Sequence, residues 1–182
     1  MILFLDYDGV LHPQTPRQNL SDADNRLFSY LPRLEAVLRD FPQYRIVVSS
    51  SWREGRPWEN VISAFSGDIS QRIIGSTPVL QRKEPPYPKH PRFDEIELYL
   101  AAKGQQRVRW LALDDEARLF PPDCPNLLLC ADGFRQAEED ALRARFKEQF
   151  RKNVARSGHR TLALELVDDF VPPWRPALGL AS

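Results

Sequence analysis

The most constraining feature of the sequence is an apolar run that ends in two acidic residues. Residues 2–5, Ile-Leu-Phe-Leu, are followed by Asp6, Tyr7, Asp8 and Gly9. A continuous apolar run of this length is typical of a strand covered on both faces, as in a parallel sheet. Two carboxylates at the end of such a strand repel each other and resist loss of water unless a cation or a proton compensates. The run therefore predicts a buried strand that carries a metal-binding pair of acids, one of which can act as a nucleophile toward phosphorus.

Further apolar runs alternate with helical patterns along the chain. We expect strands over 44–48, 72–74 and 108–113, a fifth strand over 127–130, and helices over 58–65, over 93–100 and from Phe134 onward. Strands that alternate with helices predict parallel strands joined by crossovers, and hence an α/β fold with a doubly wound, Rossmann-like sheet. We expect one such domain over residues 1–155, followed by a C-terminal extension, 156–182, in which Leu162 to Val167 fits either a strand or a helix.

Two connecting segments have patterns of their own. Ser21 begins a stretch with helical spacing that continues from Leu27 to Leu38, and Pro32 either divides it into two helices or begins the second one. Residues 76–91 are rich in proline and predict an ordered surface loop or a mobile flap.

Polar residues fall where the predicted strands end. Asp6 and Asp8 follow the first strand, Ser50 follows the second, and Asp114 and Asp115 follow the strand over 108–113. The carboxyl ends of parallel strands meet at one edge of the sheet, so these residues should converge in one crevice. Carboxylates with a substrate phosphate are the oxygen ligands that suit Mg²⁺, so the sequence predicts Mg²⁺-dependent phosphoryl transfer.

Phosphoryl transfer also needs groups that hold the phosphoryl oxygens. The hydroxyls and backbone N–H groups at Ser50 and Ser51, at the start of a predicted helix, are suited to this. A cation must neutralise the charge that develops in the transition state. Lys83, Lys89 and Arg92, which precede the fourth strand, are the three candidates.

The same residues carry a resemblance to a known family. The sequence resembles the haloacid dehalogenase-like (HAD) superfamily over roughly residues 1–150, in motif I (6–11), motif II (Ser50 after 46–48) and motif IV (113–115). Residues 47–53 and 132–134 are similar to a subgroup of small HAD domains, which includes those of RNA-repair proteins.

The resemblance implies a role for each motif residue. Asp6 would become phosphorylated, and Asp8 would protonate the leaving oxygen and then activate water. The Asp6 carboxylate, the Asp8 backbone carbonyl and Asp114 would hold Mg²⁺, with Asp115 binding directly or through water. Ser50 would donate a hydrogen bond to the phosphoryl group.

The motif III cation is less clearly marked. Arg92 fits best by position, Lys89 is the second candidate, and Lys83 is the third. If Arg92 is the cation, we expect Lys89 to bind the substrate, as we expect of Arg53. The segments 10–45 and 54–91, between the motifs, are too short for a large cap domain, so the site should be open to larger substrates.

Three residues near the predicted crevice have more than one interpretation. Trp52, Arg53 and Trp58 could stack on and clamp a base. Alternatively, Trp52 and Trp58 are packing residues, and Arg53 pairs with a surface acid such as Glu54 or Glu59.

Composition excludes several other classes. A formal net charge of zero and a pI of about 6.8 provide no basic field for non-specific nucleic-acid binding. No segment approaches the roughly 18 apolar residues of a membrane span, and the start of the chain does not resemble a signal peptide. We therefore expect a cytoplasmic protein with no membrane contact, and no feature indicates an obligate protein partner.

These observations predict a Mg²⁺-dependent phosphatase that forms an aspartyl-phosphate. Its substrate would be a phosphate ester, either a small molecule such as a nucleotide or a nucleic-acid end. Two alternatives remain: a catalytically silent module that binds phosphate or a partner, and a phosphotransferase.

Overall fold

The computed structural model describes residues 1–80 and 88–156, and its central element is a five-stranded parallel sheet. The strands are β1 (Ile2–Leu5), β2 (Arg45–Val48), β3 (Ile73–Ser76), β4 (Trp110–Asp114) and β5 (Leu127–Leu129). Their order across the sheet is β3-β2-β1-β4-β5, and every neighbouring pair is parallel. The predicted doubly wound α/β fold is confirmed.

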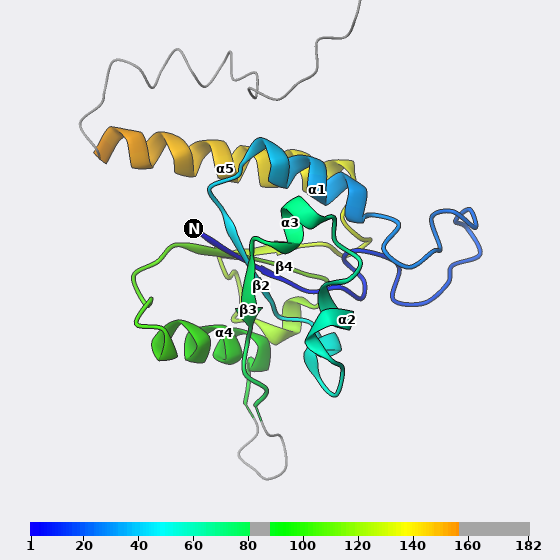
Figure 1. Cartoon of the computed structure of the whole chain (residues 1–182), viewed down its shortest axis with the longest axis horizontal. Helices are drawn as coiled ribbons and strands as arrows, with labels where there is room; N and C mark the ends of the chain where they lie inside the picture. The colour runs from blue at the N-terminus through cyan, green and yellow to red at the C-terminus, as the bar shows by residue number, and fades with distance from the viewer. Residues whose placement is uncertain (81–87, 157–182) are drawn as a thin grey trace, which may run out of the picture. The chain divides into compact units, whose positions relative to one another are not determined.

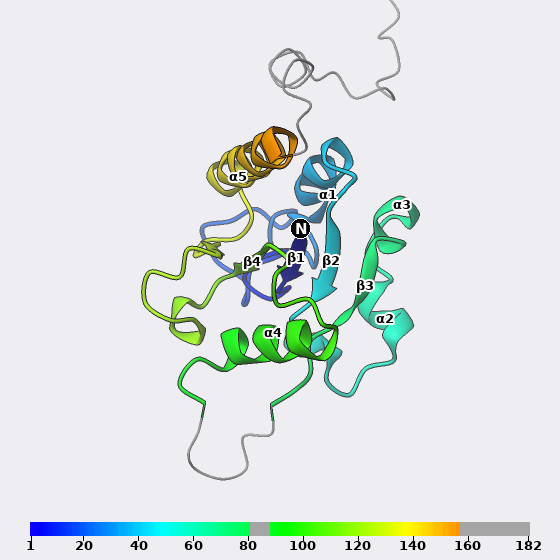
Figure 2. The same ribbon diagram turned by 90° about the vertical axis from the view of Figure 1, so that its left-hand side faces the viewer.

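Helices connect the strands. They are α1 (Leu31–Asp40), α2 (Trp58–Ile62), α3 (Gly67–Ser70), α4 (Pro91–Ala102) and α5 (Gln136–Arg156), with short 3-10 turns η1 (Ser51–Arg53) and η2 (Ala117–Leu119). Figures 1 and 2 show α1 and α4 on opposite faces of the sheet. The described residues contain no helix that is long and apolar enough to cross a membrane.

The chain divides into two compact units, Met1–Ala141 and a second unit from Leu142. The first unit holds the sheet and α1 to α4. The described part of the second unit is the continuation of the helix α5 to Arg156. The predicted domain boundary at residue 155 stays a prediction.

The central strand β1 is buried because helices cover both faces of the sheet and apolar side chains of β1 project toward each face. Ile2 and Phe4 belong to a cluster with Ile96, Tyr99 and Leu100 of α4. Because side chains alternate along a strand, the other two residues of β1 point to the face on which α1 lies, and both are fully buried. This explains why the strand reads as a continuous apolar run.

The strand order places the ends of β1 and β4 next to each other. After β1 the chain passes to β2 and β3 on one side, and it then returns to β4 and β5 on the other. Leu5 pairs with Val48 of β2 and with Leu113 of β4. Ligands of doubly wound sheets bind outside the carboxyl ends of the strands at which the order reverses in this way, which here are β1 and β4.

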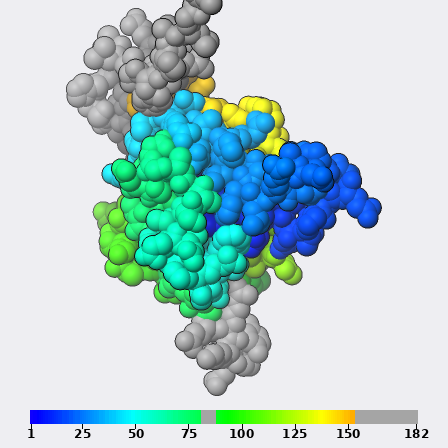
Figure 3. Space-filling model, turned by 45° about the vertical axis from the view of Figure 1, so that its right-hand side comes forward, coloured from blue at the N-terminus to red at the C-terminus, as the bar shows by residue number. Residues whose placement is uncertain are grey.

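The predicted helix from Ser21 is absent from the structure. Residues 21–30 form successive turns instead, and α1 begins at Leu31 with Pro32 in its first turn. Phe28 has φ of 60°, which no right-handed helix allows, and Leu27 is 65% exposed rather than facing the core. The segment 12–30 protrudes from the sheet (blue in Figure 3).

Smaller differences concern element bounds. The predicted helix over 58–65 is shorter, ends at Ile62, and is followed by α3, which the sequence pattern did not indicate. β3 begins at Ile73 rather than Arg72. The described parts of the proline-rich segment, 77–80 and 88–90, are neither helix nor strand. Lys83 and the segment 162–167 lie outside the described residues.

Candidate active site

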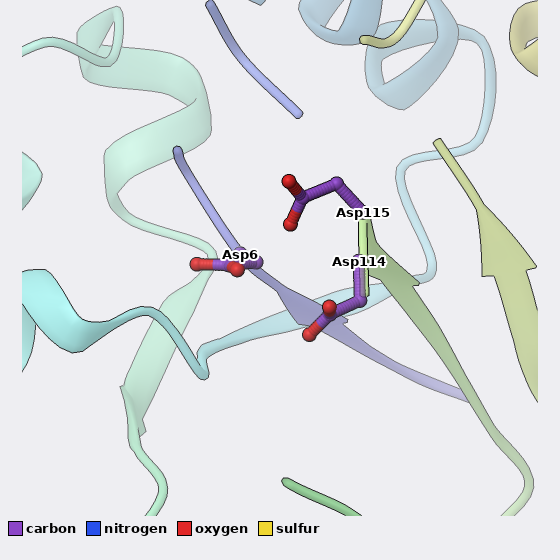
Figure 4. A group of neighbouring side chains, drawn as sticks. All are labelled: Asp6, Asp114 and Asp115. Atoms are coloured by element: carbon purple, nitrogen blue, oxygen red, sulfur yellow. The ribbon is translucent and has the colours of Figure 1, made fainter. Parts of the chain in front are cut away.

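Three carboxylates gather where β1 and β4 end. Asp6 follows β1, Asp114 is the last residue of β4, and Asp115 is next in the chain (Figure 4). Each offers an oxygen, and these oxygens lie within 4.8 Å of one another. The backbone N–H of Asp6 donates to the Leu113 carbonyl at 3.0 Å, so the ladder between the two strands fixes the spacing of the acids.

Burial makes this group of acids electrostatically unfavourable when it is fully ionised. Asp6 is 6% exposed and Asp114 is fully buried. Burial raises the pKa of Asp6, and Arg92 opposes that rise. Burial and then the charge of Asp6 raise the pKa of Asp114 to about 7 and that of Asp115 to about 6.

The donor set suits a divalent cation. Asp114 Oδ2 is buried and forms no hydrogen bond, although Arg92 Nε lies 3.3 Å from it, and a bound cation would supply the missing ligand. Oxygen atoms from three carboxylates at this spacing are hard ligands of the kind that Mg²⁺ and Ca²⁺ bind. The residues present therefore fit a metal ion at Asp6, Asp114 and Asp115.

Gly9 allows the carboxylate of Asp115 to approach the first loop. Its φ is 72°, and a Cβ at this position would overlap with the Asp115 carboxyl group. A side chain here would therefore strain the backbone and displace one of the three acids.

Arg92 is the cation beside this group. It lies in the first turn of α4, with Nη2 3.8 Å from Asp6 Oδ2 and Nε 3.3 Å from Asp114 Oδ2. Glu95, one turn further along α4, lies 3.4 Å from Arg92 Nη1 and helps to orient the guanidinium. One arginine thus faces two of the three acids.

Asp8 is separate from the group of three. Its carboxylate accepts a hydrogen bond from Trp52 Nε1, 3.0 Å from both oxygens, and it lies 3.1 Å from His12 Nε2. The hydrogen bond with His12 is the largest influence on Asp8 and, with Trp52, lowers its pKa against the opposing effect of burial. Asp6 and Asp8 therefore have different surroundings: Asp6 lies among the other acids, and Asp8 is bound by Trp52 and His12.

A cleft of about 570 Å³ opens over these residues. Its wall includes Asp6, Asp8, Asp115 and Arg92, and most of its other lining residues are also polar or charged. The remaining lining residues are Gln14, Ser51, Glu54, Val79, Leu80, Glu95, Glu116, Arg118 and Leu119. A volume of this size is typical of sites for small molecules and nucleotides.

A family model described as "HAD domain in Swiss Army Knife RNA repair proteins" matches residues 2–138. The chain belongs to this HAD family. Neither a curated protein nor a solved structure matched the chain. At a coarse level, the family supports a hydrolase of the phosphatase kind, and HAD domains typically use a metal ion.

The HAD domain is capless, as the spacing of its motifs predicts. Within residues 1–80 and 88–156, the connections between β1, β2 and β3 contain turns and α1 to α3 but no further sheet. The cleft over the acids is therefore bounded by loops, short turns and the first turns of α4.

The two serines of motif II take different positions in this HAD domain. Ser50 is fully buried, and its hydroxyl hydrogen-bonds with Asp6. Its Oγ also accepts a hydrogen bond from Trp52 N at 3.4 Å, which caps η1. Ser51 is exposed on the cleft wall.

Two predicted substrate ligands do not reach the cleft. The Arg53 guanidinium is buried and donates to Glu95 at 2.7 Å and to four backbone carbonyls, those of Ser49, Ser50, Thr77 and Pro78. It therefore joins the ends of β2 and β3 to α4 rather than projecting from the rim. Lys89 is exposed and is not among the lining residues.

Sequence reasoning missed two residues at the site, His12 and Glu95. His12 follows Asp8 by four residues, and that spacing across the turn at Gly9 was the available signal for a contact between them. Glu95 lies one helical turn after Arg92, which predicts a contact on the same face of α4. Its second contact, with Arg53, depends on the tertiary fold.

Proposed function

We propose that this HAD domain is a Mg²⁺-dependent phosphatase that forms an aspartyl-phosphate on Asp6. The observation that carries the proposal is the grouping of Asp6, Asp114 and Asp115 beside Arg92 at the reversal of strand order. A bound Mg²⁺ would offset the charge of the acids and of the substrate phosphate.

In the first step, an Asp6 carboxylate oxygen attacks the phosphorus of the substrate. The bond from phosphorus to the leaving oxygen breaks, and that oxygen takes a proton from Asp8. Arg92 stabilises the negative charge that develops on the phosphoryl oxygens. Ser51, which lines the cleft, is a proposed hydrogen-bond donor to those oxygens, and Ser50 would join it by turning its hydroxyl away from Asp6.

In the second step, water attacks the phosphorus of the phosphorylated Asp6. Asp8 accepts a proton from the water, and the acyl-phosphate bond breaks to return Asp6 as a carboxylate. Asp8 lines the cleft, and two side chains outside the metal group orient it. A module that only binds phosphate has no need for a second acid held in this way, which favours turnover over silent binding.

The proposed substrate is a phosphate ester at a nucleic-acid end, with small phosphate esters as the alternative. The family's description as a domain of RNA repair proteins supports the first choice. The cleft volume of about 570 Å³ is sufficient for a terminal nucleotide. Lys89 remains a proposed contact for a longer substrate. Arg53 is not proposed as a substrate contact, because its side chain is buried and paired with Glu95. A cytoplasmic location also remains a prediction.

Phosphate release from p-nitrophenyl phosphate tests the reaction class. We expect release by the wild type with Mg²⁺, loss of release with EDTA, and loss of release in Asp6→Asn, whose fold circular dichroism should show intact. Release by Asp6→Asn at the wild-type rate would contradict the assignment of the nucleophile. Release that rises when alcohol acceptors are added, with transfer to them, would indicate a phosphotransferase.

A further inference from the structure

The carboxylate of Asp8 is held by two side chains that have no place in the metal group. Trp52 Nε1 lies 3.0 Å from Asp8 Oδ1 and 3.0 Å from Oδ2, so the indole N–H is shared between the two oxygens. His12 Nε2 lies 3.1 Å from Oδ1. Because an ionised carboxylate only accepts hydrogen bonds, His12 must carry its proton on Nε2 in this contact.

Both donors are themselves fixed by aromatic packing. The His12 and Trp52 rings lie 5.9 Å apart, and each lies 5.2 Å from the ring of Phe28. Tyr7 packs edge-on against Trp52 at 5.7 Å, and its hydroxyl donates to the Val61 carbonyl at 3.1 Å. The donors therefore have little rotamer freedom, and they define one position for the carboxylate.

Asp8 remains accessible despite these contacts. Its side chain is 34% exposed and lines the cleft, whereas the His12 side chain is 4% exposed. A carboxylate has about four acceptor sites, so one shared indole N–H and one imidazole N–H leave capacity for a water molecule. Because Asp8 lines the cleft, a water molecule in the cleft can reach its carboxylate.

We propose that His12 and Trp52 are positioning residues that aim the Asp8 carboxylate at the water that hydrolyses phosphorylated Asp6. This inference rests on the proposed function. The water oxygen bonds to phosphorus, one water proton passes to Asp8, and the electrons of the breaking bond return to the Asp6 carboxylate. Misplacing Asp8 weakens its proton transfer in both steps, but p-nitrophenolate leaves without needing a proton, so with p-nitrophenyl phosphate the second step is the one that slows.

The variant Trp52→Phe tests this role because it keeps an aromatic ring and removes the indole N–H, together with part of the ring. A rapid-quench experiment with p-nitrophenyl phosphate and Mg²⁺ measures kcat, KM and the fraction of enzyme that carries phosphate. We expect kcat to fall about tenfold, a part of the 10²–10⁴-fold that a positioned acid or base supplies. We also expect an unchanged KM and a higher phosphorylated fraction.

His12 is tested in the same assay with two substitutions. His12→Phe keeps a ring against Phe28 and removes the donor, so it should raise the phosphorylated fraction as Trp52→Phe does. His12→Gln restores a side-chain N–H donor and should return kcat toward the wild-type value. Trp58→Phe is the matched control, because Trp58 is a partly exposed tryptophan outside the cleft lining, and it should leave all three quantities unchanged.

A merely structural role for the two donors gives a different result. Loss of folded enzyme lowers kcat without raising the phosphorylated fraction per active site, and that outcome would overturn the inference. An unchanged kcat in both Trp52→Phe and His12→Phe would also overturn it.

A spectroscopic measurement separates this inference from the proposed function. The indole N–H signal of Trp52 in a ¹H–¹⁵N spectrum, assigned with Trp52→Phe, should move in Asp8→Ala and stay in place in Asp114→Asn. If the chemical shift of this signal is unchanged in Asp8→Ala, the hydrogen bond does not form and the inference is wrong, whatever the activity. If the signal moves but the wild type forms no phosphoenzyme and releases no phosphate, the proposed function fails instead.

Discussion

Asp114→Asn should make the metal-free protein more stable at alkaline pH. Asp114 is fully buried, and its pKa rises from an ordinary value of 3.8 to about 7. Each pKa unit corresponds to about 1.4 kcal/mol, so ionising Asp114 in the folded state costs up to about 4 kcal/mol. Because Asp6 titrates in the same group, part of that cost is shared, and we expect a gain of about 2–4 kcal/mol in the variant.

The pH dependence has a definite sign. A raised pKa in the folded state means that the folded protein holds a proton which the unfolded chain releases, so the stabilisation is present below pH 3.8 and is lost as the pH rises through about 7. The asparagine does not titrate. The stability difference between variant and wild type should therefore be small near pH 4 and reach its full value above pH 7.

Urea denaturation with EDTA, between pH 5 and pH 8.5, measures this difference. Asp22→Asn is the matched control, because Asp22 is exposed in a turn, and it should follow the wild type at every pH. With Mg²⁺ at about 100 times its dissociation constant, the wild type should gain about 2.7 kcal/mol, whereas Asp114→Asn should gain much less. If Asp114→Asn is less stable than the wild type at pH 8 in EDTA, the Arg92 contact already compensates Asp114, and the argument for a required cation is refuted.

Two further predictions concern neighbours of the acids. Arg92→Ala should lower kcat/KM at least tenfold, which corresponds to a loss of about 1.4 kcal/mol of transition-state stabilisation. Lys89→Ala should change kcat/KM less than twofold. Steady-state kinetics with p-nitrophenyl phosphate measures both effects, and a larger effect of Lys89→Ala would assign the cation to Lys89. Gly9→Ala and Gly55→Ala both place a side chain at φ of 72°, but only at Gly9 does the new Cβ meet Asp115, because nothing lies within 4 Å of a Cβ at Gly55. Both variants should lose about 1 kcal/mol of stability from backbone strain. Calorimetric titration should show weaker Mg²⁺ binding in Gly9→Ala alone. Equal Mg²⁺ affinities of the two variants would contradict the proposed position of Asp115 at the metal.

The strands and the three acids were predictable from the sequence because each depends on local pattern and topology. A parallel strand covered on both faces must be apolar where it is covered, so β1 is apolar throughout, β2 is apolar over 46–48 and β4 is apolar over 110–113. The strands end where polar residues begin, and the doubly wound order then brings Asp6 and Asp114 together. No long-range information beyond the fold class was needed.

The turns over 21–30 were not predictable because helical spacing alone does not establish which residues reach the core. Leu27 matches the spacing yet is 65% exposed, and Phe28 adopts a positive φ while its ring packs against Tyr7, His12 and Trp52. Tertiary contacts of Phe28 therefore replace the local helical preference.

The role of Arg53 was also beyond the sequence. Its partners include Thr77, Pro78 and Glu95, which are 24 to 42 residues away. Local pattern shows only a basic residue after a predicted strand, which is compatible with a substrate contact or a surface ion pair. The structure confirms a pairing with Glu54, whose Oε1 lies 3.9 Å from Arg53 Nη1, and the other contacts of Arg53 hold the loop after β3 and the helix α4 near the acids.

The most direct test of the central claim is to locate the phosphoryl group on the chain. Wild-type protein mixed with p-nitrophenyl phosphate and Mg²⁺, quenched rapidly in acid and digested, should yield a peptide that carries phosphate on Asp6. Asp8→Asn should increase the amount of that peptide, and EDTA should remove it. Phosphate on another residue, or turnover with no phosphorylated peptide in either protein, would contradict the aspartyl-phosphate account.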